Sequence, residues 1–190
     1  MKIDLAVLGR QYELHAAAYE AAALRALRSG WYIMGPELAG FEEAFAAYTG
    51  AKYAIGLNSG LDALTLSVAA LGIGAGDEVI VPANTYIATV LAVTANEAVP
   101  VFVEPDEYYS LDASKLEAAI TARTCAIMPV HLYGQAVDMA SVMTIAKRHH
   151  LAVIEDCAQS HGAHFGDVMT GRFGDIGCFS FYPTKNLGAF

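Results

Sequence analysis

Short apolar strands alternate with helical segments along most of this chain, and this alternation is the feature that most limits its fold. Runs rich in Val and Ile are separated by amphipathic segments of helical length, with short turns between them. Near-continuous apolar strands are typical of a parallel sheet covered on both faces, and strand–helix alternation produces right-handed crossover units. The sequence therefore predicts an α/β fold with three layers, αβα, around a mostly parallel sheet.

The expected elements follow these patterns and the Gly and Pro residues that punctuate them. The 190 residues suffice for one sizeable core and are too few for two full domains. No repeat, low-complexity tract or flexible linker interrupts the pattern. Helices are expected at 11–29, 37–49, 60–71, 85–95, 113–120 and 139–149, and strands at 53–57, 78–83, 99–103, 125–130, 152–155 and 175–182.

Composition excludes several classes of function. Apolar residues make up 55% and charged residues 16%, which indicates a well-buried globular protein. The net charge of -9 argues against nucleic acid as a partner, because phosphate backbones demand a basic face. No apolar run is long enough for a membrane span, and the first residues lack a signal-peptide pattern, so a cytoplasmic protein is expected. The three cysteines lack CxxC spacing and are expected to be small buried residues, not disulfide partners.

Candidate ligand-binding motifs follow predicted strands, which is where open α/β sheets bind ligands. The run 58–61 (Asn-Ser-Gly-Leu) turns a strand into a helix through a glycine, so backbone amides and the helix dipole favour an anion. An ordinary helix cap explains the same residues. The run 72–76 (Gly-Ile-Gly-Ala-Gly) lies between a helix and a strand, the reverse of the order in a dinucleotide-binding motif, and is expected to be a turn.

Polar and aromatic side chains follow two further strands. Asp156 ends a predicted strand, where a buried carboxylate needs a cationic partner such as a protonated pyridine nitrogen. Alternatively, it caps the next turn. Gln159 lies in that turn, within reach of a ring oxygen on the same ligand. Tyr86 follows another strand, where its ring either stacks on a flat heterocycle or packs against the protein.

Lys185 lies in an apolar, turn-rich stretch after the last predicted strand, and Ser180 precedes it. Most lysines are solvated surface groups, but a partly buried lysine can serve as an amine nucleophile. A lysine that traps an aldehyde, an acid that keeps a ring nitrogen protonated and a glycine turn that binds phosphate are the parts needed to hold pyridoxal phosphate. The motifs together therefore predict a site for that cofactor.

The histidines offer a rival interpretation. His161 and His164, together with Asp156 and Cys157, supply side chains that ligate metals. Their spacing matches no strong metal-binding pattern, and the region is a glycine-rich loop. No metal site is expected.

Several long runs in order resemble the fold-type I aminotransferases, specifically the pyridoxal-phosphate-dependent family that aminates nucleotide-linked keto sugars. The resemblance implies that residues 1–190 hold an N-terminal segment and most of the large cofactor-binding domain, and that the family's C-terminal small domain is absent. The likeness extends from about Tyr32 to the chain end and includes the runs 76–82 (Gly-Asp-Glu-Val-Ile-Val-Pro), 131–135 (His-Leu-Tyr-Gly-Gln), 155–163 (Glu-Asp-Cys-Ala-Gln-Ser-His-Gly-Ala) and 179–188 (Phe-Ser-Phe-Tyr-Pro-Thr-Lys-Asn-Leu-Gly).

The resemblance also implies a role for each candidate residue. Lys185 is the catalytic residue and forms the Schiff base, and Asp156 pairs with the ring nitrogen of pyridoxal 5'-phosphate. Gln159 lies near the ring oxygen, and Tyr86 stacks on the ring. The phosphate group of the cofactor is expected to bind at the turn of Ser59, Gly60 and Leu61 and at Ser180, with backbone amides as donors at Gly60 and Leu61.

The implied reaction is transamination of a nucleotide-linked keto sugar with an amino acid donor, for which glutamate is expected. A 3-keto-6-deoxyhexose carried on dTDP is the preferred substrate, because the runs 59–64 and 84–89 look most like those of transaminases that act on such sugars. The 4-keto branch more often has a small hydroxyl residue where Leu61 stands. A 4-keto sugar, a cyclitol or an aromatic precursor are alternatives, as is a non-catalytic fragment. A homodimer is expected, in which the second subunit supplies part of the cofactor site.

Overall fold

The computed structural model describes residues 7–189, which separate into two compact units that divide after Gly56. Residues 1–6, where the sequence shows no signal-peptide pattern, and residue 190 lie outside the described residues. The first unit contains α1 (Leu8–Ser29) and α2 (Pro36–Thr49), which confirm the two helices predicted there. Among the described residues, no helix is both long and apolar enough to cross a membrane.

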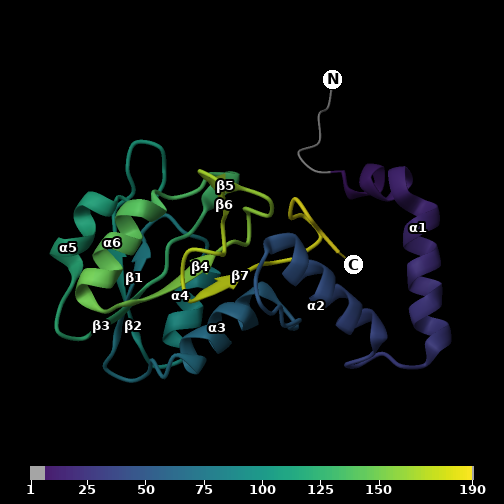
Figure 1. The fold of residues 1–190 in the computed structure, drawn as a ribbon, viewed down its shortest axis with the longest axis horizontal. Coiled ribbons are helices and arrows are strands. Elements are labelled where there is room, and N and C mark those ends of the chain that lie inside the picture. The colour runs from purple at the N-terminus through teal and green to yellow at the C-terminus, as the bar shows by residue number, and fades with distance from the viewer. Residues whose placement is uncertain (1–6, 190) are drawn as a thin grey trace. The chain divides into compact units, whose positions relative to one another are not determined.

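The second unit is built on a five-stranded sheet in the order β2-β1-β3-β4-β7, and all neighbouring strands are parallel (Figure 1). The predicted strands from 78 onward are confirmed, although the last is much shorter than the run 175–182. The strands are β1 (Glu78–Pro82), β2 (Val99–Val103), β3 (Thr124–Ile127), β4 (Ala152–Asp156) and β7 (Ile176–Cys178).

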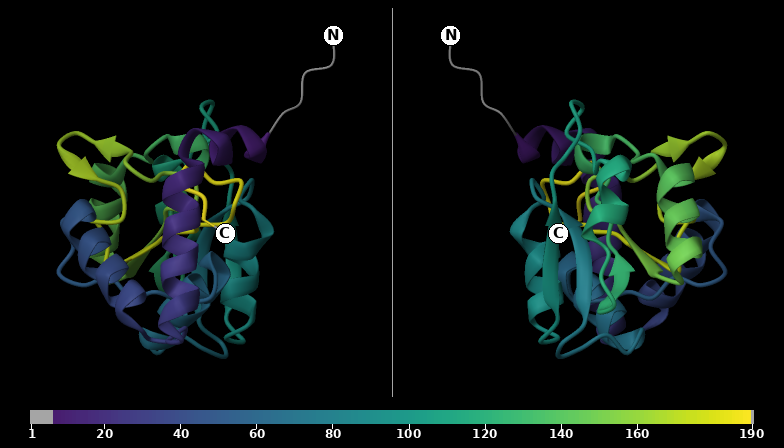
Figure 2. Two further views of the ribbon diagram at one scale, coloured as in Figure 1. Left: turned by 90° about the vertical axis from the view of Figure 1, so that its right-hand side faces the viewer. Right: turned by 90° about the vertical axis from the view of Figure 1, so that its left-hand side faces the viewer.

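Helices cover both faces of this sheet (Figures 1 and 2). Successive residues of β1 alternate between the two cores: Val79 and Val81 belong to one buried cluster and Ile80 to the other. This alternation follows from the period of two residues in a strand. The predicted three-layer αβα architecture is confirmed. One layer contains α3 (Gly60–Ala70) and α4 (Ile87–Thr94), and the other contains η1 (Ala113–Lys115), α5 (Leu116–Ala119) and α6 (Met139–His149).

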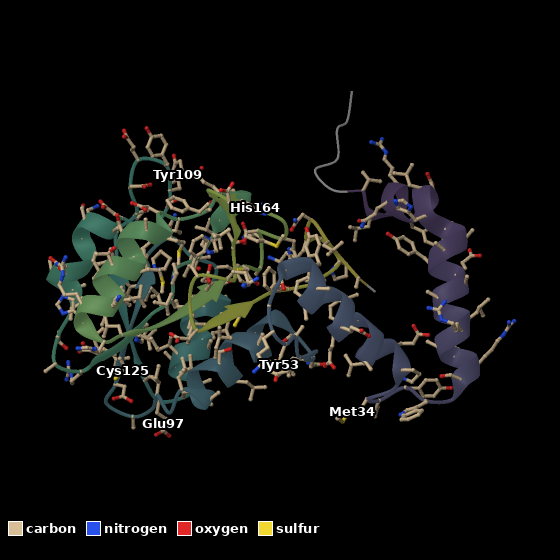
Figure 3. The ribbon with its side chains drawn as sticks, viewed as in Figure 1. Met34, Tyr53, Glu97, Tyr109, Cys125 and His164 are labelled. Atoms are coloured by element: carbon tan, nitrogen blue, oxygen red, sulfur yellow. The ribbon has the colours of Figure 1, made fainter. Side chains whose placement is uncertain are left out.

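The strand predicted at Tyr53–Leu57 is wrong. This run forms neither strand nor helix, and the side chains of Tyr53 and Ile55 are 73% and 77% exposed (Tyr53 is labelled in Figure 3). A strand needs a hydrogen-bonded neighbour, and the part of the chain that the structure describes pairs no strand with this run. The apolar residues of this run are therefore typical of a buried strand, but no strand of the described sheet pairs with them.

A β-hairpin occupies the region that the sequence analysis treated as a glycine-rich loop. Its strands β5 (His164–Phe165) and β6 (Val168–Met169) pair antiparallel, and a two-residue turn joins them. The first turn residue, Gly166, has a φ of 60°, which glycine adopts without steric cost. Strands of two residues are too short to show a hydrophobic period, which explains why the sequence pattern missed them.

Candidate active site

The candidate site lies at the carboxyl ends of β4 and β7. Asp156 is the last residue of β4 and pairs with Cys178 at the end of β7. Because the two strands are parallel neighbours, the segment that leaves β7 and carries Ser180 and Lys185 starts beside Asp156. The strand order thus brings together two motifs that are far apart in the sequence, as the predicted cofactor site requires.

The start of α3 contacts Ser180. A Cβ placed on Gly60 would lie 2.7 Å from the Cβ of Ser180 and 3.1 Å from its Oγ, so only glycine permits this approach. Ser180 is buried, and its Oγ accepts a long hydrogen bond from the backbone N–H of Tyr182 at 3.4 Å. The predicted phosphate-binding residues on two separate segments therefore lie side by side.

Ser59 has a structural task at this turn. It is the N-cap of α3, and its Oγ accepts a hydrogen bond from the backbone N–H of Asp62 at 3.1 Å. A helix start leaves several N–H groups without partners inside the helix, and those of Gly60 and Leu61 belong to this set. The Leu61 side chain packs against the core, so what this residue offers a ligand is its backbone. Amides at a helix start, with a serine hydroxyl beside them, suit a phosphate group.

Asp156 carries a buried carboxyl group, 4% exposed. Its Oδ1 accepts a hydrogen bond from the Ala158 N–H at 3.0 Å, and its Oδ2 accepts one from Thr89 Oγ1 at 2.8 Å. Burial raises the pKa of Asp156, while these hydrogen bonds and the positive charge of Lys185 act in the opposite direction. A carboxylate in this position gains from a cationic ligand atom, and a protonated pyridine nitrogen fits that requirement.

Lys185 and Gln159 line the same hollow. Lys185 lies in a turn in which its backbone N–H donates to the Tyr182 carbonyl at 2.8 Å. Its positive charge acts to lower the pKa of Asp156, against the larger effect of burial, which raises it. Lys185 and Gln159 therefore share one hollow, and the charge of Lys185 acts on the buried Asp156. That these residues hold a cofactor stays a prediction. The hollow has a volume of about 420 Å³ and is lined by Tyr133, Gln159, Thr184, Lys185 and Asn186.

The two remaining predicted residues differ in how firmly the protein holds them. Gln159 Oε1 accepts a hydrogen bond from the Tyr133 backbone N–H at 2.9 Å, which leaves its Nε2 group as the donor for a ligand oxygen. Tyr86 precedes the first residue of α4, and its side chain is exposed. Its ring is open to a stacking ligand, and the stacking role stays a prediction.

Sequence analysis missed the buried pair of His131 and Glu155, which holds a loop next to the strand that carries Asp156. The Glu155 carboxylate accepts hydrogen bonds from His131 Nε2 at 3.0 Å and from the backbone N–H groups of Gly171, Phe173 and Gly174 at 2.7, 2.8 and 2.8 Å. Burial acts to raise the pKa of Glu155, but the hydrogen bonds from His131 and the loop outweigh it, and the pKa is lowered. Glu155 thus anchors the loop 171–174 beside the strand that ends in Asp156. The signal was present in the sequence as two adjacent acids at a strand end.

The same pair accounts for the one metal-like cluster found among the described residues. His131, Glu155 and Cys157 place ligand atoms within 4.8 Å of one another. His131 Nδ1 accepts a hydrogen bond from the Val137 N–H at 3.1 Å, so its Nε2 carries the proton and donates to Glu155. Both imidazole nitrogens and both carboxylate oxygens already have hydrogen-bond partners. The arrangement is explained without a metal ion, and Cys157 is a buried free thiol.

The fold and the site together define a class of protein: an α/β domain that presents a lysine, a buried aspartate and a helix start with free backbone amides at one sheet edge, as pyridoxal-phosphate-dependent aminotransferases do. The model of the DegT/DnrJ/EryC1/StrS aminotransferase family matches residues 15–190. The chain belongs to this family.

Individual relatives agree with this assignment. The chain is 55% identical over 180 residues to a dTDP-3-amino-3,6-dideoxy-alpha-D-galactopyranose transaminase of Aneurinibacillus thermoaerophilus, which covers 94% of this chain and 49% of that protein. The structure of this chain matches that of DesV of S. venezuelae, solved in complex with a ketimine intermediate. The TM-score is 0.97 and the identity 50%, and the match covers 100% of this chain and 51% of DesV. The match to NtdA of Bacillus subtilis with bound cofactor PMP has a TM-score of 0.93 and 37% identity, over 100% of this chain and 43% of that one. The chain spans about half the length of these relatives.

Proposed function

We propose that this chain carries the cofactor-binding part of a pyridoxal-phosphate-dependent aminotransferase that acts on a nucleotide-linked keto sugar. The observation that carries the proposal is the buried Asp156 carboxylate together with Lys185, whose positive charge acts on it and whose side chain lines a hollow. In the reaction, the amino group of a donor, proposed to be glutamate, moves to the carbonyl carbon of the sugar, and the donor leaves as a 2-oxo acid.

Each residue of the site has a task in this reaction. Pyridoxal phosphate, when bound, supplies an electron sink. Lys185 would hold the cofactor's aldehyde through its Nζ atom, and the same amine would move a proton during the transfer. Asp156 would hold the proton on the pyridine nitrogen, and Gln159 would donate to the ring oxygen. The backbone amides of Gly60 and Leu61 and the hydroxyl of Ser180, at the turn capped by Ser59, would hold the phosphate group, and the Tyr86 ring would stack on the pyridine.

The preferred sugar is a 3-keto-6-deoxyhexose on dTDP. The name of the Aneurinibacillus relative supports this choice, since that protein is a transaminase of a dTDP-linked 3-amino-3,6-dideoxy sugar. Leu61 supports it as well, because its apolar side chain stands where the 4-keto branch more often has a hydroxyl. We also propose that the enzyme works as a homodimer in which the second subunit completes the cofactor site.

Trapping of the cofactor tests the central assignment. The product of the whole reading frame is incubated with pyridoxal phosphate, reduced with borohydride and mapped by peptide mass. The adduct is expected on Lys185 and is expected to vanish in Lys185→Ala, while the control Lys147→Ala, on α6, keeps it. An adduct on Lys52, Lys115 or Lys147 contradicts the assignment. Formation of 2-oxoglutarate with dTDP-linked 3-keto and 4-keto sugars then tests the substrate.

A further inference from the structure

Two hydroxyl groups form a chain that leads from the start of α4 to Asp156. The Oγ1 atoms of Thr85 and Thr89 lie 2.7 Å apart, and Thr89 Oγ1 donates to Asp156 Oδ2 at 2.8 Å. Thr89 is fully buried, and Thr85 is half-buried. A buried hydroxyl on an apolar helix needs a partner, and here that partner is the carboxylate proposed to face the cofactor.

The direction of these two hydrogen bonds follows from counting protons. An ionised carboxylate only accepts hydrogen bonds, so the single hydroxyl proton of Thr89 points at Asp156. The proton between the two threonines must then come from Thr85. Both hydroxyl dipoles therefore point their positive ends toward Asp156, and hydrogen bonds to the charged form favour that form.

The helix α4 also connects the hydrogen-bonded threonines to Tyr86, the proposed ring-stacking residue. The backbone N–H of Thr89 donates to the Tyr86 carbonyl at 3.1 Å, so the two residues lie one turn apart at the start of α4. With the Ala158 N–H on Oδ1 and Thr89 on Oδ2, both oxygens of the carboxylate are held in place. The rotation of the Asp156 carboxyl group is thereby fixed by groups that belong to the protein.

We propose that Thr89, supported by Thr85, is a positioning residue that orients the Asp156 carboxylate toward the pyridine nitrogen and keeps it ionised. Thr89 acts through Asp156. The inference rests on the proposed function, since it assumes that Asp156 meets the ring nitrogen of pyridoxal phosphate.

The test compares two ligands that differ at one ring atom. The cofactor-free product of the whole reading frame is titrated with pyridoxal phosphate and with its 1-deaza analogue, in which a C–H group replaces the ring nitrogen. The unaltered protein is expected to prefer pyridoxal phosphate. Thr89→Val keeps the shape and removes the hydroxyl, and it is expected to reduce this preference about tenfold, as loss of a hydrogen bond to a charged group does. Thr89→Ser restores the donor and is expected to keep the preference.

The controls separate positioning from general structural damage. Thr144→Val removes an exposed hydroxyl that bonds its own helix at Ala140 and should leave both affinities unchanged. If Thr89→Val weakens the two ligands by the same factor, the residue is merely structural and the proposal is overturned. If the unaltered protein binds both ligands equally, the role of Asp156 in the proposed function fails as well. If Thr89→Val does not fold, Thr85→Val takes its place, and an unchanged preference in that variant overturns the proposal.

Discussion

At the scale of single residues, the ionised carboxylate of Asp156 is a group of the candidate site that lowers the stability of the cofactor-free protein. Burial raises the pKa of Asp156 above its ordinary value of 3.8. The ionised group therefore opposes folding: the stability present below about pH 3.8 is lost as the pH rises through the raised pKa. Above that window the cofactor-free protein holds a buried carboxylate whose hydrogen bonds and nearby Lys185 only partly offset the cost of burial, and a ligand cation offsets more of it.

Asp156→Asn is accordingly expected to have effects of opposite sign on stability and on function. At pH 7.5 the cofactor-free variant should be more stable than the parent, as measured by urea denaturation, and this gain should disappear near pH 3.5. Transamination by the variant should fall by two or more orders of magnitude, about 3 kcal/mol or more in the barrier, because the ring nitrogen loses its anionic partner. Asp167→Asn, at the exposed hairpin turn, is the control. Near-normal turnover in Asp156→Asn would show that the residue only caps a turn.

The residues that could be predicted from the sequence are those whose type is unusual for their place. A lysine in an apolar stretch and an acid at the end of a buried strand both demand an explanation, and the structure brings Lys185 and Asp156 to one edge of the sheet. Thr89 could not be predicted in this way, because a threonine in a short helix is ordinary. Its importance arises from a contact across 67 positions of the sequence.

At the scale of elements, the start of α3 depends on an absent side chain. Gly60→Ala would place a Cβ 2.7 Å from the Cβ of Ser180, so the helix start and the segment after β7 must separate. We expect a loss of about 1–3 kcal/mol in the free energy of unfolding. We also expect weaker binding of pyridoxal phosphate, measured by fluorescence titration. Gly40→Ala in α2, where the added Cβ meets nothing within 4 Å, is the matched control. Unchanged affinity in Gly60→Ala would contradict the phosphate assignment.

Elements were predictable where local pattern and tertiary surroundings agree. Both faces of β1 are buried, so its apolar run and its structure coincide. The run 53–57 has the same kind of pattern but lacks a pairing partner in the described chain, and the last strand ends at Cys178 because the chain then turns toward Lys185. Local sequence reports what a segment can do, whereas pairing depends on which neighbours the fold supplies.

At the scale of the whole molecule, the described residues include a run of large apolar side chains that face solvent. Four consecutive residues between α1 and α2 have large exposed side chains: Trp31, Tyr32, Ile33 and Met34 are 62%, 69%, 81% and 81% exposed (Met34 is labelled in Figure 3). Four exposed apolar side chains in succession favour association with another apolar surface. The chain also matches about half the length of its relatives, so its site contains only the groups that this half supplies.

We therefore expect residues 1–190, produced alone, to self-associate, to bind pyridoxal phosphate weakly and to show no transaminase activity. Sedimentation velocity should show oligomers that grow with concentration, because burying the patch of residues 31–34 removes apolar surface from water. The double variant Ile33→Ser, Met34→Ser should shift the distribution toward monomer, while the control Val168→Ser, at the exposed hairpin, should not. A monomeric chain of 190 residues with a cooperative melt and measurable turnover would contradict this expectation. Such a result would mean that residues 1–190 already contain every group the catalysis needs.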